Sequence, residues 1–284
     1  MRSKGVSVQK DLGCFHDLEV LRLVDFGLYL DAGSQDVLLP KKEIPAGTKL
    51  GDRLRVFLYT DSDDRPIATM KSPKAAYGEI ALMTVVSTSQ IGAFADWGLE
   101  KDLFIPPKEQ RPRMEKYRQY LIKVLLDPVT NRLYGTNRIE NHLPENPSPM
   151  ADGDTVSLRI YRESPLGWSV LINDERMGIL YRSEVFEPLA IGDVRAGFIR
   201  SIRDDGKIDV SLRRTGSSAD EDAAAAVLCK LEEAGGFLPY HYKSAPEDLG
   251  RVFGLSRKAF KKALTRLIES GTIELTEEGI HRKK

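Results

Sequence analysis

The chain has 284 residues, of which 41% are hydrophobic and 30% charged, a composition typical of soluble globular proteins that argues against disorder, collagen-like repeats and coiled coil. The length predicts two or more domains. Lys and Arg number 42, as do Asp and Glu, so the formal net charge is zero and only local basic patches remain for holding a nucleic acid.

Neither a membrane helix nor a secretory signal is expected. The longest apolar-looking stretch, Val20 to Leu30, is interrupted by Arg22 and Asp25 and is shorter than the roughly 20 residues that a membrane span needs. The basic start is not followed by an apolar segment or a small-residue cleavage site, so the cytoplasm is the expected location. The two cysteines, Cys14 and Cys229, form no CxxC motif, which argues against a disulfide framework and a zinc site.

A pattern of short strands recurs three times along the chain. Each copy has a glycine at a strand bend, at Gly27, Gly92 and Gly167. A Gly-Asp pair follows 24 residues later in the first copy (51 − 27) and 25 residues later in the third (192 − 167). Each copy spans roughly 60 to 70 residues and holds about five strands separated by turns. Five strands in so short a segment favour a small closed barrel, since a flat sheet would leave its edges exposed.

Composition marks the boundaries between the copies. Leu143 to Pro149 holds three prolines in seven residues, which predicts a linker or an extended hinge. Gly216-Ser217-Ser218 separates the third copy from the last segment, whereas the junction Ser72 to Gly78 is short enough for the first two barrels to pack together. The predicted domains are barrels over residues 1–75, 76–145 and 150–215, and a different domain over residues 219–284.

The last domain begins with two predicted helices. Three consecutive acidic residues from Asp220 suit a helix N-terminus, alanines follow them, and Gly235-Gly236 ends the helix. Ser244 to Glu247 has the spacing of a capping box, which opens a second helix that Gly254 ends.

A third helix, capped by Ser256, has two contrasting faces. Its apolar face is predicted to consist of Phe260, Ala263, Leu264, Leu267 and Ile268. Its basic face consists of Arg257, Lys258, Lys261, Lys262 and Arg266. A hairpin follows over residues 272–281, and three helices before a β-ribbon are the order of a winged helix, whose third helix usually reads nucleic acid. The basic face is either such a contact or a solvated surface, and winged helices also dock proteins.

The order of these domains resembles a known architecture. With Gly27-Leu28-Tyr29 and Gly92-Ala93-Phe94 as Gly-x-aromatic bends, and Gly-Asp strand starts at residues 51 and 192, the copies are similar to S1 RNA-binding domains. The whole chain, including residues 255–264 and 273–280, is similar to the conserved virulence factor B family of bacterial RNA-binding regulators. The resemblance implies a multidomain, mainly β fold: three S1-like OB-fold β-barrels followed by an α+β winged-helix domain.

Single-stranded nucleic acid is held by aromatic faces on which bases stack and by cations that follow the phosphates. The stacking candidates are Phe26, Tyr29, Phe94 and Trp168, with Trp97 as a further one. The phosphate candidates are Lys41, Lys42, Lys108, Arg111, Arg113 and Arg182 in the barrels, and Arg257, Lys258, Lys261 and Lys262 in the winged helix. A strand aromatic is as often core as platform, because strand residues alternate faces. In the third copy Ser169 takes the aromatic position, so not every barrel need bind.

The sequence lacks the motifs of an enzyme. It has no dinucleotide fingerprint, P-loop or nucleophile elbow, and its four histidines are scattered, so neither catalysis nor a cofactor is expected. Asp61, Asp63 and Asp64 lie in a predicted turn, where Asp is favoured for local backbone bonding rather than for holding a metal.

Three functions fit these observations. The main hypothesis is a cytoplasmic protein that binds single-stranded RNA with low sequence specificity and regulates gene expression. The second is a DNA-binding transcriptional regulator that acts through the winged helix. The third is a protein-docking scaffold, which the zero net charge favours.

Overall fold

The computed structural model describes residues 12–185, 187–213 and 217–283, and of residues 217–219 only the backbone. The chain divides into two compact units, Met1–His142 and Leu143–Lys284. Within the described residues, the helices are all too short or too polar to cross a membrane.

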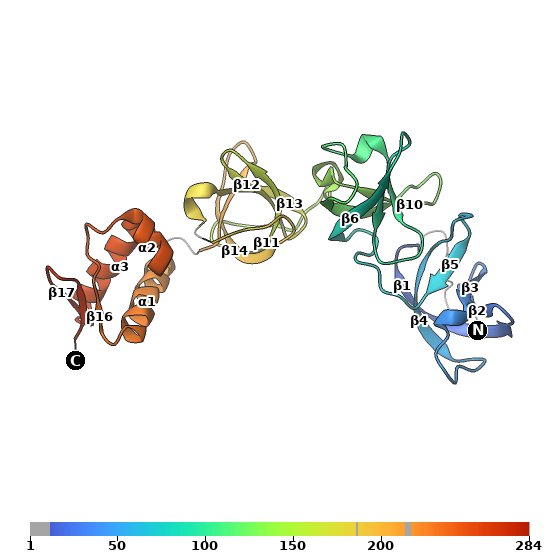
Figure 1. Cartoon of the computed structure of the whole chain (residues 1–284), viewed down its shortest axis with the longest axis horizontal. Coiled ribbons are helices and arrows are strands. Elements are labelled where there is room, and N and C mark those ends of the chain that lie inside the picture. Colours follow the sequence, from blue (N-terminus) through green and yellow to red (C-terminus); the bar gives the residue numbers. More distant parts are fainter. Residues whose placement is uncertain (1–11, 186, 214–216, 284) are drawn as a thin grey trace. The chain divides into compact units, whose positions relative to one another are not determined.

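The first barrel is a closed sheet in the order β1-β2-β3-β5-β4. Its strands are β1 (Phe15–Val24), β2 (Gly27–Asp31), β3 (Asp36–Pro40), β4 (Arg53–Thr60) and β5 (Pro66–Thr69), and the short helix η1 (Lys41–Glu43) follows β3 (blue to cyan in Figure 1). Alternate residues of the strands point inward, as the barrel requires. The barrel closes where β3 pairs in parallel with β5 at Leu38 and Ile67.

The second barrel repeats this order. Its strands are β6 (Ile80–Thr88), β7 (Ala93–Asp96), β8 (Leu103–Ile105), β9 (Gln119–Leu126) and β10 (Leu133–Thr136), with the short helices η2 (Pro107–Glu109) and η3 (Ile139–His142). They form a five-stranded sheet in the order β10-β9-β6-β7-β8. The two outer strands approach each other at Gly135, where an added Cβ would lie 3.0 Å from side-chain atoms of Leu103 and Ile105.

The third barrel is again closed, in the order β11-β12-β13-β15-β14. Its strands are β11 (Thr155–Ser164), β12 (Gly167–Ile172), β13 (Arg176–Tyr181), β14 (Val194–Ile202) and β15 (Ile208–Ser211), with η4 (Arg182–Glu184) after β13. The expectation of three S1-like OB-fold barrels is therefore confirmed.

The glycine that opens the pattern in each copy permits a close approach between strands. A Cβ at Gly27, Gly92 or Gly167 would lie 2.3, 2.5 or 2.2 Å from a carbonyl oxygen of the neighbouring strand, of Leu39, Ile105 or Leu180 respectively. No side chain fits at such a distance, so these positions need glycine.

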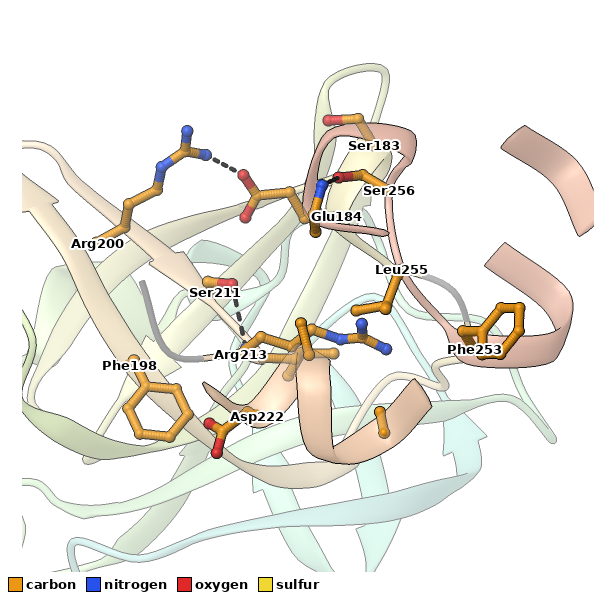
Figure 2. Close-up of a pocket in the computed structure, with 14 residues that line it drawn as sticks. Ser183, Glu184, Phe198, Arg200, Ser211, Arg213, Asp222, Phe253, Leu255 and Ser256 are labelled. Carbon is orange, nitrogen blue, oxygen red and sulfur yellow. Dashed lines mark hydrogen bonds and ion pairs between the residues drawn. The ribbon is translucent and has the colours of Figure 1, made fainter. Parts of the chain in front are cut away.

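The last domain contains three helices and a small sheet. The helices are α1 (Ser217–Glu233), α2 (Pro246–Phe253) and α3 (Arg257–Glu269), and the sheet has the order β16-β18-β17, with β16 (Phe237–Leu238), β17 (Ile273–Leu275) and β18 (Ile280–Arg282). Ser256 caps α3 as predicted, because its Oγ accepts the backbone N–H of Ala259 at 3.2 Å (Figure 2). Gly254 ends α2 in the left-handed conformation, with φ at 60°.

Two details of this domain differ from the prediction. Ser244 does not form a capping box: Ala245 is the N-cap of α2, and the Ser244 Oγ instead accepts the backbone N–H of His241 at 2.9 Å. Ile268, predicted on the apolar face of α3, is 38% exposed because Leu264 and Leu267 already fill the space against the core.

The first two barrels pack together through a shared hydrophobic cluster, as the short junction predicted. Phe57 and Tyr59 of β4 pack edge-on against Trp97, with ring centroids 5.9 and 6.4 Å from the indole. Trp97 is 3% exposed, and its Nε1 donates to the carbonyl of Lys101 at 2.7 Å. The prediction that Trp97 is a stacking platform is wrong, because the indole is buried between the two barrels and no base can reach it.

Replacing Trp97 with alanine would leave a cavity in the shared core. We expect Trp97→Ala to lower the free energy of unfolding of residues 1–142 by about 3–5 kcal/mol, the range for large aromatic truncations. Native-state hydrogen exchange on the full chain measures this, since the slowest amides of β4 and β9 report on this unit. Val129→Ala, at a side chain that is 86% exposed, is the control and changes the same quantity by less than about 0.5 kcal/mol. Equal effects would contradict this assignment.

The pH dependence of stability at alkaline pH tests the burial of Tyr59 in this core. Burial, helped by the nearby carboxylates of Glu100, Glu43 and Asp61, raises the pKa of Tyr59 from 10.0 to about 12. Because the pKa is higher in the folded state, the stabilisation is complete below pH 10.0 and is lost as the pH rises towards 12. We expect Tyr59→Phe to lose less stability across this window than the unaltered chain. Urea denaturation followed by circular dichroism provides the comparison, and identical pH profiles would count against it.

Candidate nucleic-acid interface

The outer face of the second barrel carries three aromatic rings. Phe94 on β7 lies directly opposite Phe104 on β8, and the ring centroids are 5.3 Å apart. Both rings point outward, because the flanking Ala93 and Ala95 are fully buried. These two rings and Tyr134 of β10 line one cavity of about 500 Å³. All three rings are partly exposed, so together they offer a platform for flat ligands.

Three cations, Lys101, Lys108 and Arg132, line the same cavity. We call this cavity, with its three rings and three cations, the aromatic groove. Lys108 follows β8 on η2 and is exposed, without an ion pair among the residues that the structure describes. The other two cations contact one carboxylate, with Asp64 Oδ1 2.9 Å from Lys101 Nζ and Oδ2 2.5 Å from Arg132. The hydrogen bond from Lys101 holds the pKa of Asp64 below its ordinary value.

The equivalent face of the first barrel is less aromatic. Tyr29 on β2 occupies the position that Phe94 has in the second barrel. Its cross-strand partner on β3 is Leu38, which in turn pairs with Ile67 on β5. The guanidinium of Arg22 lies 4.2 Å from the centre of the Tyr29 ring. Phe26, at the β1–β2 turn, is 59% exposed and packs edge-on against Tyr29 at 6.4 Å. This face offers one or two rings beside a cation.

The third barrel has a polar face at the same place. Ser169 and Ile179 are paired, and the next position is Asp209, whose carboxylate accepts hydrogen bonds from Arg203 at 2.8 to 3.1 Å. Trp168 stands one residue away and packs partly against the barrel core, with the Arg182 guanidinium 4.9 Å from its ring.

The cations around the third barrel are neutralised. Arg182 bonds Glu163 at 2.9 Å, and Arg200 forms an ion pair with Glu184 (Figure 2). This barrel therefore lacks the combination of stacked rings and accessible cations that the second barrel has.

The remaining predicted phosphate contacts in the barrels are scattered. Lys42 forms an ion pair with Glu100, and Arg111 lies 3.7 Å from Glu140. Lys41 on η1 and Arg113 in the loop after η2 are exposed, and neither has an ion pair in the described part of the chain. None of the four lines the aromatic groove.

The basic face of α3 is partly covered by α1. Lys262 contacts Asp220 at 3.3 Å, and Arg266 contacts Glu221 at 2.6 Å. Arg257, Lys258 and Lys261, in the first turns of α3, are exposed and form no ion pair with any residue in the described ranges. The accessible positive charge of α3 therefore lies at its N-terminal half.

The predicted turn reading of the three acidic residues is confirmed. Asp61 Oδ1 accepts the backbone N–H groups of Asp63 and Arg65, each at 2.9 Å. In the ranges that the structure describes, His, Cys, Asp and Glu side chains form no group of three that would hold a metal ion.

Comparisons with known proteins match both kinds of domain. The S1 domain family matches residues 12–71, and the CvfB-like winged helix domain matches residues 225–281. Conserved virulence factor B of Staphylococcus epidermidis is 26% identical over 297 residues, covering 98% of this chain and 99% of that protein. Over nearly its whole length the chain is therefore similar to the conserved virulence factor B proteins.

Two further proteins align with this chain along most of its length. The Bacillus subtilis protein named "Uncharacterized protein YitL" is 27% identical over 274 residues, covering 94% of this chain and 92% of that protein. A crystal structure of a multidomain protein with nucleic acid binding domains from Streptococcus pneumoniae covers 96% of this chain and 99% of its own, with 23% identity and a TM-score of 0.43.

The S1 and winged-helix domains support nucleic-acid binding as the general function of this conserved virulence factor B relative. Of the six residues of the groove, Phe94 and Lys108 were predicted from the sequence as nucleic-acid contacts. The other four were not: Phe104, Tyr134, Lys101 and Arg132. Phe104 was detectable, because strict alternation in Leu103-Phe104-Ile105 places it on the same face as Phe94 across the hairpin. The other three come from β10 and from loops whose approach to β7 no local pattern reveals.

Proposed function

We propose that this conserved virulence factor B relative binds single-stranded RNA with low sequence specificity, chiefly in the aromatic groove of the second barrel. The observation that supports the proposal is the convergence of Phe94, Phe104 and Tyr134 in one cavity beside three cations. The proposal includes a cytoplasmic, non-enzymatic role in regulating gene expression after transcription, which the family resemblance implies.

The groove suits unpaired bases better than a duplex. Bases of a duplex are stacked on one another and expose only their edges, whereas unpaired bases present a flat face to an aromatic ring. Each stacked base contributes about 1–3 kcal/mol, whatever its identity, which is why low specificity is expected. Tyr29 and Phe26 of the first barrel belong to the same compact unit and provide a second, weaker contact. Linked sites of this kind raise the effective concentration of the strand.

Truncating one ring of the groove tests the proposal. We expect Phe94→Ala to weaken binding of a labelled single-stranded RNA by about 1–3 kcal/mol, because one stacking face is lost. Fluorescence anisotropy at low and at physiological salt measures the affinity, with duplex DNA as the comparator. The control is Val129→Ala in the β9–β10 turn, because this side chain is 86% exposed and does not line the groove as its neighbours do, and the change leaves the affinity unchanged. Preference for duplex DNA would contradict the proposal, and failure to bind either at low salt would favour a protein-docking role.

A second candidate function is binding of duplex DNA by the winged helix as a transcriptional regulator. It is favoured by the three exposed cations at the start of α3, which have no carboxylate partner in the described residues. A recognition helix places its N-terminal residues in the major groove.

Charge removal on α3 separates the two candidates. If the winged helix holds duplex DNA, neutralising Lys258 and Lys261 together as glutamines reduces the slope of log affinity against log salt by about 1.8, since each phosphate contact contributes about 0.9. Lys262→Gln is the matched control, because Lys262 already contacts Asp220 and its loss changes the slope less. If duplex affinity is absent in the unaltered chain, or insensitive to the double change, the second candidate fails.

A further inference from the structure

One carboxylate in the aromatic groove comes from the other barrel. Asp64 belongs to the β4–β5 turn of the first barrel, yet it lines the groove of the second. Its two oxygens contact two different cations, Lys101 Nζ at 2.9 Å and an Arg132 guanidinium nitrogen at 2.5 Å. A planar anion therefore lies between an ammonium and a guanidinium group, at the edge of a stacking platform.

The β4–β5 turn fixes the backbone that carries this carboxylate. Asp64 has a φ of 60°, in the left-handed region that asparagine and aspartate tolerate better than other residues with a side chain. Its backbone N–H donates to the carbonyl of Asp61 at 3.0 Å, and the Asp61 side chain in turn accepts two backbone N–H groups of the same turn. The backbone position of Asp64 is thus set by the turn itself, and the side chain reaches the two cations from there.

The pairing of Asp64 with the cations is not what joins the barrels. That junction is made by the buried Trp97 and its contacts with Phe57 and Tyr59. The side chains of Asp64 and Arg132 are 36% and 59% exposed, and ion pairs at such exposure contribute little to stability. A role in the groove itself accounts better for an acidic residue at this position.

We propose that Lys101 and Arg132 form a binding site for a backbone phosphate and that Asp64 occupies this site until a nucleic-acid strand displaces it. A carboxylate and a phosphodiester both present two anionic oxygens to a guanidinium fork, so either fits between these two cations. That the displacing phosphate belongs to an RNA strand rests on the function proposed above.

This arrangement determines the class of ligand that the groove accepts. A nucleoside has a base to stack on Phe94 and Phe104 but no anion to replace Asp64, while a polyanion without bases gains nothing from the rings. A nucleotide supplies both, and a strand supplies several bases, each of which offsets part of the cost of displacing the carboxylate when it stacks. Asp64 therefore lowers the affinity of every anion at this site by a similar factor, and a polyanion without bases, which gains nothing from the rings, remains a weak ligand.

Asparagine at this position removes the charge and keeps the shape and the left-handed backbone. We expect Asp64→Asn to bind single-stranded RNA about three- to tenfold more tightly at low salt, the scale set by one nearby charge in water. The slope of log affinity against log salt steepens by up to about 0.7, because no displaced carboxylate is left to take up a cation in place of the one that the phosphate releases. Inorganic tripolyphosphate is the second probe and gains by a similar factor, which calorimetry measures. Adding Arg132→Gln to Asp64→Asn removes the gain for both probes.

Asp63→Asn is the matched control, because Asp63 lies in the same turn, contacts Arg65 at 2.8 Å and does not line the groove. It leaves both affinities unchanged. The proposal is overturned if Asp64→Asn binds both probes no more tightly than the unaltered chain. Arg132→Gln alone, in the unaltered background, provides a test that does not depend on the folding of the Asp64 variant: it weakens RNA binding, and unchanged affinity would also overturn the proposal.

The two probes separate this proposal from the proposed function. If tripolyphosphate binds more tightly to Asp64→Asn while no RNA binds to any form, the phosphate site stands and the proposed function fails. If RNA binding depends on Phe94 but is indifferent to Asp64 and Arg132, the proposed function stands and the phosphate site fails.

Discussion

The packing of Trp97 between two aromatic residues of the neighbouring barrel determines much of the first unit. Phe57 and Tyr59 hold the indole from the side of β4, and the indole nitrogen donates to the carbonyl of Lys101. This hydrogen bond fixes the backbone from which the Lys101 side chain reaches the turn of the first barrel, where it contacts the Asp61 carbonyl and Asp64. A buried hydrophobic contact thereby positions charged groups at the surface, and the groove has walls from both barrels.

The three barrels keep the same interior and differ on one outer face. Each has the bend glycine and the same strand order, and the cores of the first and third barrels consist of aliphatic residues. The outer face, in contrast, holds a tyrosine and two aliphatics in the first barrel and a serine, an isoleucine and an aspartate in the third. In the second barrel it holds the paired Phe94 and Phe104, with Tyr134 lining the same cavity. Folding constrains the interior, whereas the outer positions contribute little to the core and are available for function.

The fold was predictable from sequence because its signals are local. Gly-Asp strand starts and the Ser256 cap act within a few residues, and the bend glycines act within a single hairpin. The groove was only partly predictable, because its members meet through the register between strands and the contact between barrels. Trp97 was wrongly predicted for the same reason. Its place in the sequence fits a stacking platform as well as a core residue, and it is buried only because Phe57 and Tyr59 of the other barrel pack against it. Ser244 has the spacing of a cap, but a competing bond to His241 within the preceding turn prevails.

The bend glycine has a consequence for how such barrels change during evolution. The backbone at Gly92 and Gly167 is fixed by the neighbouring carbonyl, while the side chain two residues later, Phe94 or Ser169, points away from the interior. A duplicated barrel is therefore free to acquire, lose or exchange a ligand by changing single outward side chains, with no adjustment of the chain path. The third barrel, with its serine in place of an aromatic residue, has the same framework with a different outer face, and it offers a host in which a new binding surface can be engineered.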